Sequence, residues 1–162
     1  QSNIIADASY TDKTGIVCAI LTADCLPVVF CDQKGEYIAA AHAGWRGLAN
    51  GVLDNTIQTL PVDNDELMCW LGPAIGPNMF EVGSEVVQQF IDKEKVHENA
   101  FNVKANNKYL ADIYQLARNI LLKHGVHQIY GGDHCTYSES DKFYSYRRDG
   151  ETGRMATLIW MA

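Results

Sequence analysis

Two features are absent from the sequence, and each absence excludes a class of protein. No apolar run approaches the roughly 20 residues that span a bilayer, and no signal segment stands at the start, so we expect a cytoplasmic protein without a membrane partner. The 13 Lys and Arg are outnumbered by 20 Asp and Glu, for a net charge of −7. Because no window is strongly basic, binding to nucleic acid through phosphate neutralisation is not expected.

Paired cysteines are absent as well. The five cysteines are odd in number, are scattered along the chain and form no CxxC motif. A disulfide framework is therefore a poor interpretation, and we expect reduced thiols. Cys18, Cys31 and Cys69 are embedded in apolar runs and are interpreted as small buried residues.

The chain has the length and composition of one compact domain over residues 1–162. Of its 162 residues, 47% are hydrophobic and 20% are charged, which is enough for a sizeable core. It begins at Gln1 without a methionine, as an internal piece or a processed chain would. We therefore expect that part of the domain lies upstream.

Short apolar runs bounded by turn residues predict buried strands, and helical periodicity appears between some of them. The predicted strands are 16–21, 26–31, 37–42, 67–71, 126–130 and 155–161. The predicted helices are 48–57, 84–91 and 111–124, the last of which ends with basic residues and a glycine. Strands interspersed with helices indicate a mixed α/β or α+β domain.

Cys25 and His42 are the first candidate pair for chemistry. Cys25 lies at a bend between two predicted strands, and His42 ends the third. Thiol and imidazole are preferred zinc ligands, and a strand-turn-strand unit can bring the two strand ends together. From the residues alone, metal binding, a Cys–His nucleophilic dyad and a buried histidine remain alternatives. Asp24, beside the thiol, either steers a ligand or proton in catalysis or has a structural role in the turn.

Arg46 and Gly47 follow His42 directly before a predicted helix. Free backbone N–H groups at a helix start and a planar guanidinium both suit an anion. This turn therefore predicts a phosphate or carboxylate site next to His42. The alternative is a surface arginine stacked on Trp45.

Arg147, Arg148 and Arg154 form a second basic segment, which is dense for an acidic chain. These arginines either bind an anion or are neutralised by nearby acidic residues in a structural turn. The glycine- and proline-rich loop at 71–77 carries no titratable group and is expected to form a pocket wall.

The remaining histidines are expected to be less important for function. His97 and His127 are predicted to lie on the surface, and His124 to be a cation at a helix C-terminus. His134, beside Cys135, is a weak second candidate pair.

Four motifs together resemble the YfiH family: TADCLPVVF, AAAHAGWRGLANGVL, LGPAIGPNMFEVG and DKFYSYRRDGETGRMATLIW. They occur in the family's order and cover the chain from Ile5 onward. Members were long labelled polyphenol oxidases or laccase-domain proteins, and are now more often regarded as zinc-dependent purine nucleoside phosphorylases with adenosine deaminase activity. The resemblance implies an α+β fold, a four-layer αββα sandwich with two mixed sheets inside and helices outside.

The resemblance also implies a metal held by two histidines and a cysteine. It places two of these ligands at Cys25 and His42. The other histidine belongs to a Gln-Val-His segment that in the family lies upstream of the start of this sequence. We therefore expect roughly the N-terminal third of the family domain, and the third ligand with it, to be outside this chain.

A function follows from the resemblance. Zinc, with copper as the alternative, would activate water for the deamination of adenosine, with Asp24 steering a ligand or proton. Phosphate bound by Arg46, Gly47 and Arg147 would attack ribose C1′ of adenosine, inosine or methylthioadenosine. The expected partners are thus a small-molecule nucleoside and phosphate.

Two other enzyme classes remain alternatives. A copper-dependent polyphenol oxidase would use the same side chains, although one three-ligand site lacks the multi-metal relay expected for reducing dioxygen to water. A metal-free hydrolase would use Cys25 and His42 as nucleophile and base. A non-enzymatic binding module is the weakest interpretation, because it gives the thiol, the imidazole and the anion-binding turn no shared purpose.

Overall fold

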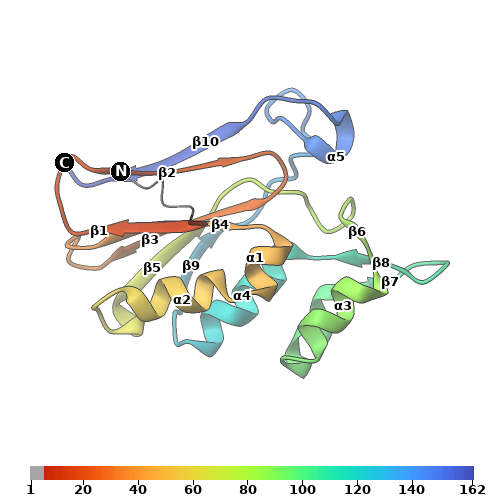
Figure 1. Ribbon diagram of the computed structural model, residues 1–162, viewed down its shortest axis with the longest axis horizontal. Coiled ribbons are helices and arrows are strands. Elements are labelled where there is room, and N and C mark those ends of the chain that lie inside the picture. Colours follow the sequence, from red (N-terminus) through yellow and green to blue (C-terminus); the bar gives the residue numbers. More distant parts are fainter. Residues whose placement is uncertain (1–5) are drawn as a thin grey trace.

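The computed structural model describes residues 6–162 and shows layers of sheet and helix (Figure 1). Helices α2 (Val52–Thr59) and α4 (Ile113–Lys123) lie against one face of a five-stranded sheet, and a two-stranded ribbon covers the other face. In spatial order the sheet consists of β1 (Ala8–Thr11), β4 (Ile38–Ala43), β3 (Leu26–Asp32), β5 (Leu67–Leu71) and β9 (Gln128–Gly131). The ribbon consists of β2 (Val17–Thr22) and β10 (Met155–Trp160).

The central strands β3 and β4 are buried because both of their faces are covered. Antiparallel pairing joins β1, β4, β3 and β5, whereas β9 runs parallel to β5, so the sheet is mixed. Three consecutive alanines of β4, Ala39 to Ala41, have no exposed surface, and their small side chains let the ribbon and helix α2 approach closely. Near-continuous apolar runs, which predicted these strands, are the pattern expected for strands covered on both sides.

The ribbon shows the alternation of a strand with one covered face. In β2 every second residue from Cys18 to Thr22 is buried, while the residues between them are exposed. Cys18 and Ile20 pack with Ala40 of β4. The register pairs Met155 with Thr22, which brings the start of β10 beside the turn that carries Cys25.

Helix α4 confirms the predicted helix 111–124 except at its ends. Asp112 caps its N-terminus, because the carboxylate accepts a hydrogen bond from the backbone N–H of Gln115 at 2.9 Å. Gly125 follows its C-terminus with φ +80°, the left-handed conformation that commonly ends a helix. His124 lies at this end, with Nε2 2.8 Å from Asp54 Oδ1 of α2.

The prediction of one continuous helix over 48–57 is wrong. Two helices occupy the region, α1 (Trp45–Ala49) and α2, and the chain breaks between them at Asn50 and Gly51. Gly51 has φ +84°, a conformation that cannot continue a right-handed helix. The first helix therefore starts before Arg46 rather than after it.

A small three-stranded sheet was not predicted. It consists of β6 (Glu81–Gly83), β8 (Lys108–Ala111) and β7 (Phe101–Val103). Strands this short carry too few residues to show a period. Helix α3 (Ser84–Ile91) follows β6 and has the predicted bounds. Two 3₁₀ helices, Asn64–Glu66 and Lys95–Ala100, complete this part of the chain.

The prediction that His97 lies on the surface is wrong. His97 is 4% exposed, and its ring packs edge-on against Phe90 with centroids 5.6 Å apart. Its Nδ1 lies 3.4 Å from the side-chain nitrogen of Asn119. Burial lowers the pKa of His97 below its ordinary 6.5, so the ring is neutral at pH 7. His127 is exposed, as expected.

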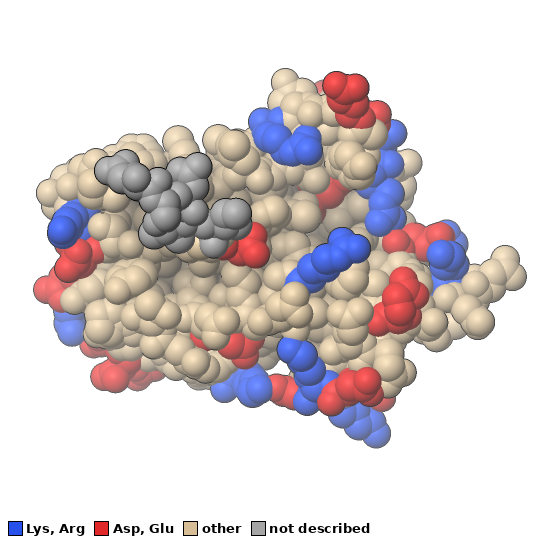
Figure 2. Space-filling model, in the orientation of Figure 1, with Lys and Arg blue, Asp and Glu red and all other residues tan. Residues whose placement is uncertain are grey.

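The predicted α+β class is confirmed, and sheets with an outer helical layer are present within residues 6–162. In that range no helix is both long and apolar enough to cross a membrane. On the face shown in Figure 2, Lys and Arg side chains are interspersed with Asp and Glu.

The carboxylate of Asp32 fixes the turn between β3 and β4. Asp32 is 2% exposed and accepts hydrogen bonds from the backbone N–H groups of Lys34, Glu36 and Tyr37, at 3.1, 2.8 and 2.7 Å. Burial alone would raise the pKa of this carboxyl, but the bonds to its charged form lower it below the ordinary 3.8. Ionised Asp32 therefore contributes stability above about pH 4, which is lost as pH falls through the folded-state pKa.

Asp32→Asn is expected to reduce the free energy of unfolding at pH 7 by about 1–3 kcal/mol, because an uncharged amide cannot accept all three bonds. The difference from the wild type should shrink as pH falls from 7 to 2, since the wild-type carboxyl becomes protonated. Urea unfolding across this range measures both effects. Glu36→Gln, at the exposed neighbour, is the control, and a pH-independent difference would contradict the prediction.

Candidate active site

Cys25 and His42 lie at adjacent strand ends, as predicted. Cys25 directly precedes β3, and His42 is near the end of β4, where it pairs with Pro27. Gly44 lies beside both side chains: a Cβ placed there would lie 2.9 Å from Cys25 Sγ and 3.8 Å from His42 Nε2. Both side chains line one cavity of about 380 Å³. Their role as metal ligands remains a prediction.

The carboxylate of Asp7 lies on the Nδ1 side of the His42 ring. Its Nδ1 lies 3.9 Å from Oδ1 of Asp7, and its backbone N–H donates to Asp7 O at 2.6 Å. Nε2 lies on the side of the ring near Gly44 and Cys25. A carboxylate near one ring nitrogen orients the other toward a metal in many metal sites. Asp7 was not identified from the sequence, because it is far from His42 along the chain and in no recognisable motif.

The Cys25 thiol is held in its neutral form. Burial raises its pKa above the ordinary 9.0, and the neighbouring Asp24 raises it further, whereas Arg154 and Arg46 act in the opposite direction. A neutral thiol is a weak nucleophile. This environment therefore argues against the metal-free hydrolase, in which Cys25 would attack the substrate.

Asp24 is buried and is bonded on both carboxylate oxygens. Oδ1 accepts from the hydroxyl of Thr136 and Oδ2 from the backbone N–H of Arg147, each at 2.6 Å. Its backbone oxygen accepts from Ile75 N–H at 3.0 Å, and its φ is +85°. These contacts match the structural alternative for Asp24, and its catalytic role remains a prediction.

Arg46 is exposed and stacks on Trp45, which is the second of its predicted alternatives, and its anion-binding role remains a prediction. Its guanidinium lies over the Trp45 ring, 4.4 Å from the centroid, and the same side chain lines the cavity with Cys25 and His42. Because Arg46 is within a helix of five residues, the anion site predicted here depends on its side chain more than on backbone N–H groups. Gly47 does not line this cavity, and it lies close to the end of β4: a Cβ placed there would be 3.1 Å from the His42 carbonyl oxygen.

In the second basic segment Arg148 has the predicted structural role, whereas anion binding by Arg147 and Arg154 remains a prediction. Arg147 and Arg154 line the cavity, and Arg147 Nη1 donates to Glu81 O at 3.0 Å. Arg148 instead pairs with Asp149 at 2.8 Å and donates to three backbone oxygens. It therefore holds together the loop that carries helix α5 (Tyr146–Asp149).

Apolar and aromatic side chains complete the cavity wall. These are Leu21, Trp45, Ile75, Phe80, Ile113 and Tyr146. Ile75 belongs to the loop that was predicted to form a pocket wall. Phe80 and Ile113 were missed, because an apolar residue that lines a cavity has the same sequence pattern as one in the core.

A slightly larger cavity, of about 420 Å³, lies between β1 and α2. Hydroxyl and amide side chains line it, together with Arg46 and Asp7, but neither Cys25 nor His42 does. We place the candidate active site in the smaller cavity because a thiol, an imidazole and three guanidinium groups meet there. Size alone would favour the other cavity.

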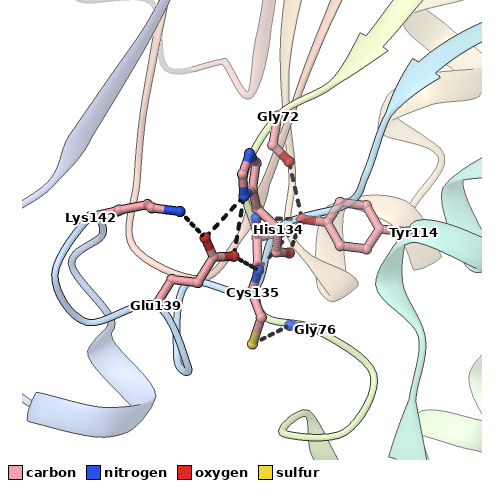
Figure 3. Close-up of polar contacts among 8 residues, drawn as sticks. Gly72, Gly76, Tyr114, His134, Cys135, Glu139 and Lys142 are labelled. Carbon is pink, nitrogen blue, oxygen red and sulfur yellow. Dashed lines mark hydrogen bonds and ion pairs between the residues drawn. The ribbon is translucent and has the colours of Figure 1, made fainter.

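The second candidate pair, His134 and Cys135, does not form a dyad (Figure 3). Cys135 Sγ accepts a hydrogen bond from Gly76 N–H at 3.2 Å and points away from the His134 ring. His134 Nδ1 lies 3.1 Å from both carboxylate oxygens of Glu139, and Tyr114 donates its hydroxyl to His134 O at 2.8 Å. This network anchors the loop to α4.

Within residues 6–162, no group of three or more His, Cys, Asp and Glu side chains is arranged to hold a metal ion. Cys25 and His42 are the Cys and His side chains that line the candidate cavity. Both are of the type that zinc and copper prefer.

Residues 2–162 match the family described as multi-copper polyphenol oxidoreductase laccase. A curated relative from Escherichia coli strain K12, named purine nucleoside phosphorylase YfiH, is 55% identical over 156 residues, or 96% of this chain. The chain belongs to the YfiH family of laccase-domain proteins. The resemblance drawn from its four motifs is thereby confirmed.

Two further proteins support this assignment. The crystal structure of Neisseria meningitidis protein NMB0706 superposes with a TM-score of 0.95, at 55% identity and over 96% of this chain. A protein from an unknown prokaryotic organism, named adenosine deaminase RL5, is 34% identical over 164 residues, or 95% of this chain. The chain spans 64% of the Escherichia coli protein, 64% of the Neisseria chain and 62% of RL5.

Asp24→Asn is expected to lower the free energy of unfolding by about 1–3 kcal/mol, because the amide can accept from Thr136 but cannot also accept from Arg147 N–H. Amide hydrogen exchange at Arg147 should accelerate for the same reason. Urea unfolding and exchange measured by NMR test the two effects. The control is Asp133→Asn, at an exposed position; an unchanged Arg147 exchange rate would contradict the structural role of Asp24.

Proposed function

We propose that the protein is a zinc-dependent purine nucleoside enzyme of the cytoplasm, which cleaves nucleosides with phosphate and deaminates adenosine. The proposal rests on one observation, which is that Cys25, His42 and arginine side chains line one cavity with aromatic walls. The names of two relatives, a purine nucleoside phosphorylase and an adenosine deaminase, support the same chemistry. Adenosine, inosine and methylthioadenosine are the proposed substrates.

Cys25 and His42 would hold the zinc. Gly44 keeps the approach to the thiol free, because a Cβ at this position would lie 2.9 Å from Cys25 Sγ, which is too close for a side chain. Zinc bound there would supply a Lewis acid that lowers the pKa of water to about 7. The carboxylate of Asp7, 3.9 Å from His42 Nδ1, would favour this orientation of the ring electrostatically, while Asp24 keeps the Cys25 turn in place.

The walls of the cavity would bind the nucleoside. Trp45 and the exposed Tyr146 would present aromatic surface that suits a purine ring, whereas Phe80 is buried in the wall behind them. Arg46 and Arg147 would hold phosphate, with Gly47 giving the turn its close packing. In phosphorolysis a phosphate oxygen bonds to ribose C1′ while the bond to the purine nitrogen breaks, and the departing purine takes up a proton. In deamination, water adds its oxygen at C6 and ammonia leaves.

A copper-dependent polyphenol oxidase is the second candidate, and the description of the matched family favours it. The same two donors would bind copper. Reduction of dioxygen to water requires several cooperating metal ions, whereas residues 6–162 supply one thiol–imidazole pair. Turnover assays with adenosine, with inosine and with a phenol, each with zinc or copper supplied, separate the two candidates.

Gly44→Ala is expected to reduce bound zinc at least tenfold without unfolding the protein. The backbone at Gly44 has φ −62° and ψ 161°, which alanine adopts readily, but its Cβ would lie 2.9 Å from Cys25 Sγ. Zinc per chain is measured by elemental analysis after dialysis, with circular dichroism as a check on folding. Gly83→Ala is the matched control, because the atoms nearest to its Cβ belong to the flexible Glu85 side chain. Full zinc content in Gly44→Ala would count against this site.

Arg46→Ala is expected to weaken phosphate-dependent cleavage roughly ten- to a hundredfold more than adenosine deamination, because only the first reaction needs a bound anion. Steady-state kinetics of inosine phosphorolysis and adenosine deamination on the same preparation provide the measurement. Equal losses in both reactions would make Arg46 a general structural residue, through its stacking on Trp45.

A further inference from the structure

Tyr114 is buried, and its hydroxyl lies between two loops (Figure 3). It belongs to the first turn of α4, and its hydroxyl oxygen accepts a hydrogen bond from the backbone N–H of Ala74 at 2.7 Å. The hydroxyl donates its own hydrogen to His134 O at 2.8 Å. Burial raises the pKa of Tyr114 above the ordinary 10.0, so the hydroxyl keeps this hydrogen at pH 7. One oxygen thus joins α4 to the loop at 71–77 and to the loop at 133–137.

The first of these loops holds the turn that carries Cys25 from both sides. Gly72 donates its backbone N–H to Pro27 O at 2.9 Å, and Ile75 donates its backbone N–H to Asp24 O at 3.0 Å. The two acceptors lie on either side of Cys25 in the chain. The two donors lie on either side of the alanine that the tyrosine hydroxyl holds. The position of this alanine therefore affects both contacts that fix the turn.

The second loop holds the same turn through a side chain. Thr136 donates its hydroxyl to Asp24 Oδ1 at 2.6 Å, and its backbone N–H donates to Ala74 O at 3.0 Å. Cys135 Sγ accepts from Gly76 N–H at 3.2 Å, which ties the two loops together at a further point. The tyrosine hydroxyl is therefore bonded to both of the loops that hold Asp24.

Tyr114 acts from outside the cavity. It does not line the cavity, whereas its neighbour Ile113 and the loop residue Ile75 do. The hydroxyl therefore affects the site through the backbone of the two loops and not through a contact with substrate. The position of the Cys25 thiol relative to His42 decides whether both side chains can bind one metal ion, and groups behind the ligands commonly fix such positions.

We propose that Tyr114 is a positioning residue of the candidate active site, because its hydroxyl holds the two loops in the arrangement that presents the Cys25 thiol to the cavity. The role of that thiol as a metal ligand rests on the proposed function. Without the hydroxyl, the backbone N–H of Ala74 loses its partner and the loops open more often. The competent arrangement is then populated for a smaller fraction of the time, and metal binding weakens in proportion to that fraction.

The test compares the wild type with Tyr114→Phe and two controls. Tyr114→Phe removes the hydroxyl and keeps the ring, and Tyr130→Phe removes the same group at an exposed position on β9. Asp32→Asn is expected to lower stability at the far end of β3 from Cys25, so it controls for a general loss of stability. Co²⁺ is titrated in place of zinc, because its absorption bands report the ligands and the coordination geometry. Amide hydrogen exchange at Ile75 is measured by NMR on the same variants.

We expect Tyr114→Phe to raise the dissociation constant of Co²⁺ roughly three- to tenfold and to shift its absorption bands, whereas both controls keep the wild-type values. Exchange at Ile75 should accelerate roughly tenfold in Tyr114→Phe, and by more than the loss of global stability accounts for. Bound Co²⁺ should slow the same exchange in the wild type, because metal binding and closure of the loops are linked.

Wild-type Co²⁺ affinity in Tyr114→Phe would overturn the proposal, whatever the stability of the variant, since the hydroxyl would then be only a structural contact. Failure of the proposed function is a separate result. If the wild type binds no Co²⁺, the metal role of Cys25 fails in this chain, and exchange at Ile75 alone decides whether Tyr114 positions the turn. An exchange rate equal to that of the wild type would in that case overturn the proposal as well.

Discussion

The buried carboxylate of Asp24 is the contact on which the arrangement of the cavity depends. Its two oxygens hold Thr136 and the backbone of Arg147, both of which are far away in the chain. Its own backbone oxygen holds Ile75. One residue thus ties three distant segments to the turn that presents Cys25. A buried carboxylate is costly unless hydrogen bonds replace its lost hydration, and both oxygens of Asp24 have such a partner.

The sheet supplies the rest of the geometry. Antiparallel pairing of β3 with β4 brings Cys25 and His42 to the same end of the sheet. Pairing of β2 with β10 brings Arg154 to that end as well. The alanines of β4 keep the layers close, so the cavity opens only where the strands end. The polar site therefore lies at the end of the core, because the close packing at the centre of the core leaves no room for it.

The sequence predicted what depends on local pattern. The main strands, helix α4 and the strand-end positions of Cys25 and His42 follow from periodicity and turn residues. The sequence did not predict the features that depend on tertiary contacts. The break at Gly51 requires a left-handed residue inside an otherwise helical pattern, and His97 is buried by helices α3 and α4, which no pattern around it indicates. Whether Arg148 or Arg154 has the structural role depends on which backbone oxygens lie within reach of its guanidinium. That is a property of the folded chain alone.

The distribution of the cavity residues along the chain has a consequence for folding. The lining residues come from positions 21–25, 42–46, 75–80, 113 and 146–154, so almost the whole described chain must be assembled before the cavity exists. Contacts between such distant positions form slowly, because long loops must close first. A ligand in this cavity would bind the folded state and not its partly folded precursors, and would thereby stabilise the entire domain to a degree that rises with its concentration. Occupancy of the cavity and survival of the folded protein are for this reason thermodynamically linked.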